Sequence, residues 1–542
     1  RVRTRRHPLV GDVLGDPVTV RPPLLGDAPS SRAYRILPRR ARVAAWCLVG
    51  VGWVVAVAPL VVSADPADPV QQWDPVFHLN GVWTILHTGQ AQPAGGLSPL
   101  YGGRAITYPI AWHAFTALFA VPTSVVQVAN VTSLLLMGIW VVGCTAFTAV
   151  VSTSRVAVLA APVLAGCTLS MPADALTMYS QWPNATGVAL LPGTAALAVV
   201  LGRRLTRSTV GGLGGAVRHL PLSGLFLLAV LGVGSAHPSA VFALLAVLAP
   251  PLLAGLSRMV RRSLWLRESG TAVVLALAAV AVVGVPLWAL TTERLRAMGR
   301  YPRHGQGWAE AFSHFLTPFP PFDSTPGLAM TVTVIALLMV AGVYATVTAV
   351  RSWDSLAATS FPDWRLPGAP VDPEDLADGG DVGVGRDVDT DADTVTVRSG
   401  DTDAVTGAAA GTAVPGTALP VRPDGEPPAL PTGGGAGAEP AAPTVAQILA
   451  ADAGRDERVR LWETRRDEVR GSLGSRPLLW PLASFLVLAG LTFLAYSPDS
   501  ALRTYLLAPW YLDPRRIMAA QNMTMVPLAA LGFEFVVNWI RS

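Results

Sequence analysis

Ten long runs of apolar residues, separated by shorter polar stretches, dominate the pattern along the 542-residue chain. A helix needs about twenty consecutive apolar residues to cross a bilayer, and each run approaches or exceeds that length. The predicted spans cover residues 43–63, 125–151, 155–171, 185–202, 220–236, 238–257, 271–290, 327–350, 476–496 and 517–540. The pattern therefore predicts an all-α fold, a polytopic transmembrane helix bundle of about ten spans.

The apolar segment 108–121 is an exception, because it is too short to span a bilayer comfortably. We interpret it as an interfacial or re-entrant helix within a long first outer loop, residues 64–124. With this choice, the arginines of the short loops at 155, 203–218 and 258–267 fall on one side. The positive-inside rule then predicts a multi-pass protein of the cell membrane with a cytoplasmic amino terminus and an external loop 64–124.

Two segments differ from the spans in composition and are predicted to be disordered and cytoplasmic. Residues 1–42 form a basic tail, and residues 351–475 form an acidic, then Ala/Gly/Pro-rich insertion, neither of which can build a core. The insertion ends in a predicted amphipathic helix, 444–471, which offers a surface to a cytoplasmic protein partner. Residues 43–350 and 476–542 are the two transmembrane regions, and an end just after an apolar helix is typical of a truncated chain.

Composition supports a membrane protein and excludes several functional classes. Only 14% of the residues are charged, against about 25% in soluble domains. The net charge of +4 comes from arginines in short loops and predicts no nucleic-acid partner. Cys47, Cys144 and Cys167 lie in apolar runs without a Cys-x-x-Cys or Cys/His cluster, so the cysteines indicate core packing and no metal site.

The stretch 73–78, WDPVFH, carries the first candidate chemistry in the outer loop. An Asp followed by Pro is typical of a helix start, and Asp74 and His78 would then lie one turn apart on one face. This pair would be a catalytic carboxylate and imidazole at the membrane surface. Alternatively, Asp74 only caps a helix that ends near Thr88 with Gly89 as its stop, and His78 only makes hydrogen bonds within the loop.

Basic residues also collect in the predicted outer loops, against the positive-inside trend. Arg303, Arg515 and Arg516 fit phosphate, because guanidinium groups bind phosphate oxygens in a bidentate way. His304 beside Arg303 would share this role. His237 lies between two apolar helices at membrane depth, where a titratable side chain indicates function. The alternative is that the arginines reach lipid headgroups.

Aromatic residues accompany these motifs and would contact sugar rings or lipid. They are Trp73, Tyr179, Trp182, Trp510 and Tyr511. The alternative is the belt of aromatic residues that membrane proteins carry at both interfaces. A carboxylate, phosphate-binding arginines and aromatic faces suggest a lipid-linked phosphosugar whose acceptor hydroxyl loses its proton to Asp74.

Three stretches carry a resemblance to known proteins: WDPVFHLNGVWTILHTG, YPIAWHAF and APWYLDPRRIMAA. They resemble an uncharacterised actinobacterial family of multi-pass integral membrane proteins. The order of basic tail, one helix and long acidic loop resembles the GT-C superfamily of glycosyltransferases. The likeness covers residues 43–350 and 476–540.

The GT-C resemblance implies a polyprenyl-phosphate sugar donor, a glycan or lipid acceptor and an acidic base in the outer loop, which corresponds here to Asp74 alone. Many GT-C loops carry a second carboxylate nearby, and this chain has His78 instead. A divalent metal is therefore not supported, and no other cofactor is expected.

The sequence favours a membrane glycosyltransferase of cell-envelope polysaccharide or glycolipid assembly. A transporter or flippase for an envelope lipid or glycan is an alternative, although we find no internal repeat and few ionisable residues within the spans. A non-enzymatic membrane scaffold, recruiting partners through residues 351–475, is a further alternative.

Overall fold

The computed structural model describes residues 39–63, 65–69, 73–152, 154–208, 219–265, 269–316, 326–360 and 479–541. The chain divides into two compact units, and all described residues belong to the unit formed by Arg1–Gly368 and Arg458–Ser542. The second unit, Ala369–Glu457, lies outside the described residues. So do residues 1–38 of the predicted tail and the predicted amphipathic helix 444–471.

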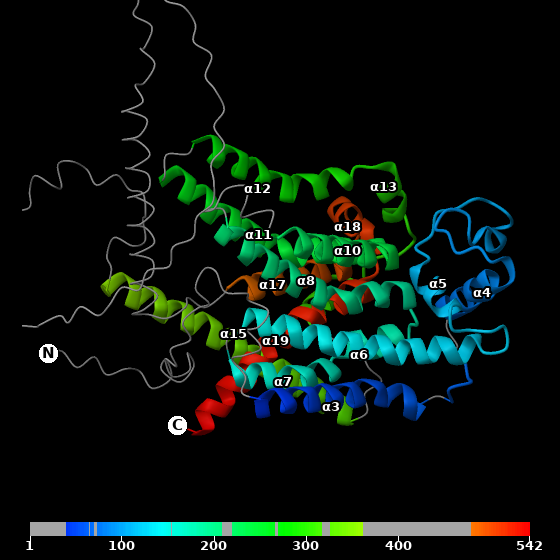
Figure 1. Ribbon diagram of the computed structural model, residues 1–542, viewed down its shortest axis with the longest axis horizontal. Helices are drawn as coiled ribbons and strands as arrows, with labels where there is room; N and C mark the ends of the chain where they lie inside the picture. The colour runs from blue at the N-terminus through cyan, green and yellow to red at the C-terminus, as the bar shows by residue number, and fades with distance from the viewer. Residues whose placement is uncertain are drawn as a thin grey trace, which may run out of the picture. The chain divides into compact units, whose positions relative to one another are not determined.

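Ten apolar helices of the described residues match the ten predicted spans (Figure 1). They are α3 (Arg39–Ser63), α6 (Val125–Val151), α7 (Arg155–Gly166), α8 (Trp182–Ser208), α10 (Leu220–Ala236), α11 (Pro238–Trp265), α12 (Ser269–Ala289), α15 (Pro326–Ser360), α17 (Trp480–Tyr496) and α19 (Pro514–Arg541). Eight are long and apolar enough to cross a membrane, with α7 counted through Asp174, whereas α10 and α17 have 17 residues each. The predicted all-α polytopic bundle is confirmed.

Among the helix ends that differ from the predicted boundaries, those of α15 and α7 change the interpretation of the chain. The helix α15 continues past the predicted start of the insertion at residue 351 and ends at Ser360. The helix α7 stops at Gly166, and the π-helical turn η2 (Leu169–Asp174) follows it. Met171 within this turn has non-helical backbone angles, and Pro172 after it cannot donate a helical hydrogen bond. The chain therefore bends inside what the pattern predicted as one straight span.

The helix α19 lies at the centre of the packed bundle. Its residues 517–530 are all buried, and it contacts α6, α7, α8, α11, α15 and α17. A tight crossing joins it to α15, because a Cβ atom on Gly532 would overlap the carbonyl oxygen of Leu338, and one on Gly342 would overlap that of Leu528. Glycine thus permits backbone-to-backbone contact between these two helices.

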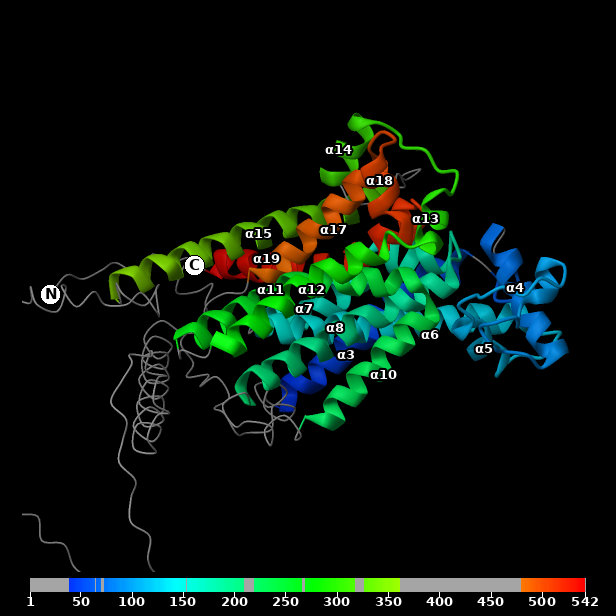
Figure 2. The same cartoon turned by 90° about the horizontal axis from the view of Figure 1, so that it is seen from above.

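Short helices connect the spans and carry most of the polar motifs. They are α4 (Trp73–Thr88), η1 (Ser98–Tyr101), α5 (Ala111–Ala117), α13 (Glu293–Gly299), α14 (Trp308–Leu316), α18 (Ala501–Leu506) and η4 (Ala508–Trp510). The segment 108–121 contains only the seven-residue α5 and does not span, as predicted. In both views α4, α5 and α13 lie toward the same end of the long helices (Figures 1 and 2).

Candidate functional site

A buried carboxylate joins two arginines at this end of the bundle. Oδ1 of Asp513, whose side chain is fully enclosed, lies 2.7 Å from Nη1 of Arg303. Its Oδ2 lies 3.5 Å from Nε of Arg516 and accepts a 3.0 Å hydrogen bond from Nε2 of Gln181. The loop after α13, the residue before α8 and the start of α19 therefore meet at one carboxylate.

Arg516 has a second fixed contact through a chain of buried side chains. Its Nη1 donates a 3.1 Å hydrogen bond to Nε2 of His237. The backbone N–H of Ser239 donates a 3.2 Å hydrogen bond to the other ring nitrogen of His237, Nδ1. That nitrogen lies 2.6 Å from Oγ of Ser239, which donates a 2.6 Å hydrogen bond to Oδ1 of Asn184. Burial, and then the charge of Arg516, hold the pKa of His237 well below its usual value. His237 thus positions Arg516, and both of its ring nitrogens are occupied.

Arg515 differs from its neighbours because it stays exposed. It lies 4.2 Å from the centre of the Tyr179 ring, and no carboxylate of the described residues forms a salt bridge with it. The guanidinium of Arg516 lies 5.0 Å from the ring centre of Tyr511, and that ring meets Tyr301 edge-on at 6.0 Å. The cluster therefore offers an uncommitted cation beside aromatic faces.

Asp74 is within electrostatic reach of this cluster. Burial raises the pKa of its carboxyl group, and the negative charge of Asp513 adds to the rise, whereas Arg516, Arg303 and Arg515 oppose it. The helix α4 ends as predicted, with Gly89 in a left-handed conformation at φ 66°. However, no described backbone N–H donates to the Asp74 carboxylate, so helix capping does not occupy it.

His78 is paired with another histidine and not with Asp74. Its Nδ1 lies 3.1 Å from Nε2 of His113 on α5, and both rings are buried. The indole rings of Trp112 and Trp182 stack at 4.8 Å next to the pair. Burial lowers the pKa of His113 to about 3, and burial, followed by the charge of His113, lowers that of His78 well below its usual value. Both rings are therefore neutral.

A second charged cluster fastens the loop that carries Arg303. The side chain of Arg503 is 2% exposed, and its Nη1 donates to the Arg303 carbonyl oxygen at 3.0 Å and to Asp499 at 2.8 Å. Its Nε donates a 3.1 Å hydrogen bond to the carbonyl oxygen of Ala495. His304, expected to bind phosphate, instead lies with its Nδ1 2.7 Å from Oδ2 of Asp499. This cluster holds the chain at Arg303 and at the two residues that follow it.

The structure brings some of the predicted site residues together and separates others. Those that it brings together are Asp74, His78, Tyr179, His237, Arg303, Tyr511, Arg515 and Arg516. Trp182 and Trp510 are enclosed, at 1% and 4% exposure, and pack on other rings, which leaves little surface for a ligand. The side chain of Trp73 lies outside the described residues.

Sequence reasoning missed three residues that organise the site, namely Asp513, His113 and Arg503. Two of them stood in the quoted motifs, where Asp513 precedes the two arginines and His113 follows Trp112. A carboxylate directly before Pro-Arg-Arg is a signal of charge pairing at a helix start. Arg503 has a local partner, Asp499 four residues before it, but no pattern predicted its contact with the distant Arg303 carbonyl oxygen.

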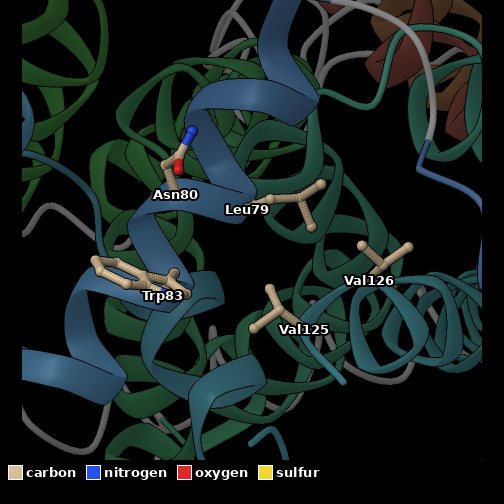
Figure 3. A pocket seen from close by; sticks show the side chains of 5 residues that line it. All are labelled: Leu79, Asn80, Trp83, Val125 and Val126. Carbon is tan, nitrogen blue, oxygen red and sulfur yellow. The ribbon is translucent and has the colours of Figure 1, made fainter. Parts of the chain in front are cut away.

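Two hollows on the described surface are lined by none of these charged residues. One of about 260 Å³ lies between α4 and α6, where Leu79 points toward Val125 and Val126 (Figure 3). Another of about 540 Å³ lies between α4 and α5 and is lined by Ile85, Leu86 and neighbouring apolar residues. Neither contains a titratable side chain. Within the described ranges, no three His, Cys, Asp or Glu side chains are grouped to hold a metal ion.

The helix bundle with its charged end defines a multi-pass membrane protein. Residues 13–361 and 469–542 match the family described as a family of unknown function (DUF6541), and the chain belongs to that family. No curated protein and no solved structure matches the chain. The matched ranges include both Asp74 and the 513–516 turn, whereas residues 362–468 fall outside them. The elements that build the site therefore lie within the residues that match the family, whereas most of the insertion lies outside them.

Proposed function

We propose that this membrane protein is a GT-C-like glycosyltransferase of cell-envelope assembly. It transfers a sugar from a polyprenyl-phosphate donor to a hydroxyl of a glycan or lipid acceptor on the outer face of the cell membrane. The observation that carries the proposal is that Asp513 brings Arg303 and Arg516 together, and that Asp74 lies within electrostatic reach of both and of Arg515. An acid–base group beside several cations suits a reaction that removes a proton and releases a phosphate.

The phosphate role falls first to Arg515. Its exposed guanidinium has no carboxylate partner among the described residues and is steadied by the Tyr179 ring. Arg303 and Arg516 share the single charge of Asp513, so the three arginines keep an excess of positive charge. Guanidinium groups bind phosphate oxygens through parallel hydrogen bonds and would stabilise the charge that the leaving phosphate gains.

Asp74 acts as the general base. Its carboxylate accepts the proton of the acceptor hydroxyl while that oxygen bonds to the anomeric carbon of the sugar. The bond between the sugar and the phosphate breaks, and the polyprenyl phosphate leaves with the electron pair. Burial raises the pKa of Asp74, which makes its carboxylate a stronger base than an exposed aspartate.

The exposed aromatic faces near the arginines fit the sugar. Tyr301 is 49% exposed, and its ring meets that of Tyr511 edge-on at 6.0 Å. An angled pair of rings next to a phosphate site would contact the apolar face of a pyranose. The sequence suggested Trp182 and Trp510 for this role, but both are enclosed in the bundle and pack on other aromatic rings.

The test compares Asp74→Asn with Asp68→Asn in membranes supplied with a radiolabelled polyprenyl-phosphate sugar. Asp68 is exposed in the same outer loop and is the matched control. Loss of the base is expected to reduce transfer by about 10²–10⁴-fold, whereas Asp68→Asn keeps the wild-type rate. Equal transfer by both variants would remove Asp74 from the mechanism. Movement of the lipid across the bilayer without a glycosylated product would favour the flippase alternative.

A further inference from the structure

The two histidines of the buried pair, His78 and His113, differ in the surroundings of their outer ring nitrogens. His78 Nδ1 and His113 Nε2 share one hydrogen bond of 3.1 Å. Nδ1 of His113 is enclosed and has no hydrogen-bond partner among the described residues. Nε2 of His78 is not enclosed in this way, and the charges of Arg516 and His237 reach this ring. One end of the pair is therefore sealed in protein, whereas the His78 ring at the other end lies within electrostatic reach of Arg516 and His237.

This inequality decides which nitrogen carries the shared hydrogen. A neutral imidazole has one donor and one acceptor nitrogen. If His78 donated, the Nδ1–H group of His113 would be buried without an acceptor, and such orphaned N–H groups are rare in folded proteins. If His113 donates from Nε2, only a lone pair is left unpartnered. His78 then accepts at Nδ1 and carries its hydrogen on Nε2.

We propose that His113 holds His78 as the Nε2–H tautomer, and that this N–H group donates a hydrogen bond to a phosphate oxygen of the ligand. This assignment rests on the proposed function, since it takes the phosphate beside Arg516 as the ligand group. His78 is then a binding residue that works without charge, and His113 is a positioning residue. Neither is the proton acceptor, which leaves that role to Asp74 alone.

The packing around the pair maintains this arrangement. A Cβ atom on Gly81 of α4 would lie 2.7 Å from Cδ2 of His113, so the ring fits directly against the α4 backbone. The Trp112 and Trp182 rings border His78 at 5.9 and 6.1 Å between ring centres. Apolar surroundings disfavour the charged imidazolium form, and the cation of Arg516 opposes it further.

The first measurement is the nitrogen-15 NMR spectrum of histidine-labelled full-length protein in lipid bilayers. The His78 signals are assigned by their loss in His78→Gln. The proposal expects a protonated Nε2 and an unprotonated Nδ1 that persist from weakly alkaline to weakly acidic pH. A protonated Nδ1, or an imidazolium at neutral pH, would overturn the assignment. This measurement does not depend on sugar transfer, so its outcome is independent of the proposed activity.

The second measurement is binding of farnesyl phosphate, with farnesol as the phosphate-free comparison. A Gln amide can donate from the position of Nε2, whereas the shorter Asn cannot, so His78→Gln should bind like the wild type. His78→Asn and His113→Phe should bind about ten- to a hundredfold more weakly, the loss expected for a hydrogen bond to a charged group. His87→Gln, on the exposed face of α4, is the matched control.

The outcomes separate this inference from the proposed enzyme activity. Equal binding of farnesyl phosphate by His78→Asn and His78→Gln would contradict the donor role. The donor role would also be contradicted if the wild-type protein bound farnesol as tightly as farnesyl phosphate. If the binding order is as expected and no sugar is transferred in the Asp74 assay, the donor role stands and the glycosyltransferase proposal fails.

Discussion

The crossing of α15 and α19 and the charged end of the bundle bring chain segments together by different means. At the crossing, Gly342 and Gly532 remove side chains so that two backbones touch. At the charged end, the polar side chains of Asp513 and Arg503 join the segments, and the Arg303 loop also meets the end of α17 directly, where the Gln306 N–H donates to the Tyr496 carbonyl oxygen. The first contact has room for no added atom. The second leaves one cation, Arg515, without a carboxylate partner among the described residues.

The difference indicates which parts of the protein carry stability and which carry binding. Close helix contacts depend on van der Waals packing, which is lost when an atom intrudes. Polar bridges can hold a loop while a neighbouring group remains free for a ligand. Substitutions at the crossing should therefore affect the amount of folded protein, and those at the uncommitted arginine should affect ligand affinity.

The largest effect is expected for Gly532→Ala, because its new methyl group would overlap the Leu338 carbonyl oxygen. The methyl group should force the backbones of α15 and α19 apart and lower the free energy of unfolding by about 3 kcal/mol, the upper part of the usual range for overpacking. Thermal unfolding followed by size-exclusion chromatography in detergent measures the change. Gly490→Ala on α17, where a Cβ atom meets nothing within 4 Å, is the control and should keep the wild-type stability. Equal stability of the two variants would contradict the described crossing.

A smaller effect is expected when Arg503→Met is compared with Arg515→Met. Arg503→Met leaves the buried carbonyl oxygens of Arg303 and Ala495 without their donor, which should destabilise the protein by about 2 kcal/mol. Arg515→Met should change stability by less than about 0.5 kcal/mol and weaken farnesyl phosphate binding about tenfold or more. Unfolding curves and binding isotherms of both variants separate the two roles. Similar losses of stability in both would contradict the distinction.

The apolar pattern was sufficient to predict the helices but not how their ends connect. Runs of about twenty apolar residues have few alternatives in a bilayer, so α3, α6 and α19 formed where expected. The short segment 108–121 also behaved as predicted, because length alone prevented a span. The bend after Gly166 was missed, since a Pro inside an apolar run does not reveal whether a helix kinks or stops.

The candidate site was predictable only as a set of loops on one side. Asp74, Arg303 and Arg515 could be grouped from the alternation of spans. The pairing of Arg303 with Asp513 and of His78 with His113 depends on side-chain directions set by long-range packing. Local pattern favoured Asp74 and His78 as partners because they are one helical turn apart. In the structure His78 instead contacts His113 from α5. The spacing of residues along the sequence does not predict that contact.

The central claim is that an Asp74 carboxylate, tuned by nearby arginines, is the base in sugar transfer. The most direct measurement is the pH dependence of kcat/KM for transfer from a polyprenyl-phosphate sugar, which reports the pKa of the free enzyme's base. Since the base must be ionised, activity should fall as the pH drops through the raised pKa of Asp74, above the usual aspartate range.

Arg516 lowers the pKa of Asp74, so in Arg516→Gln the acid limb should move to still higher pH. Arg104→Gln, which changes an exposed arginine of the outer loop, should leave the profile unchanged. An acid limb at the ordinary aspartate pKa, or one that is identical in Arg516→Gln and the wild type, would contradict the account.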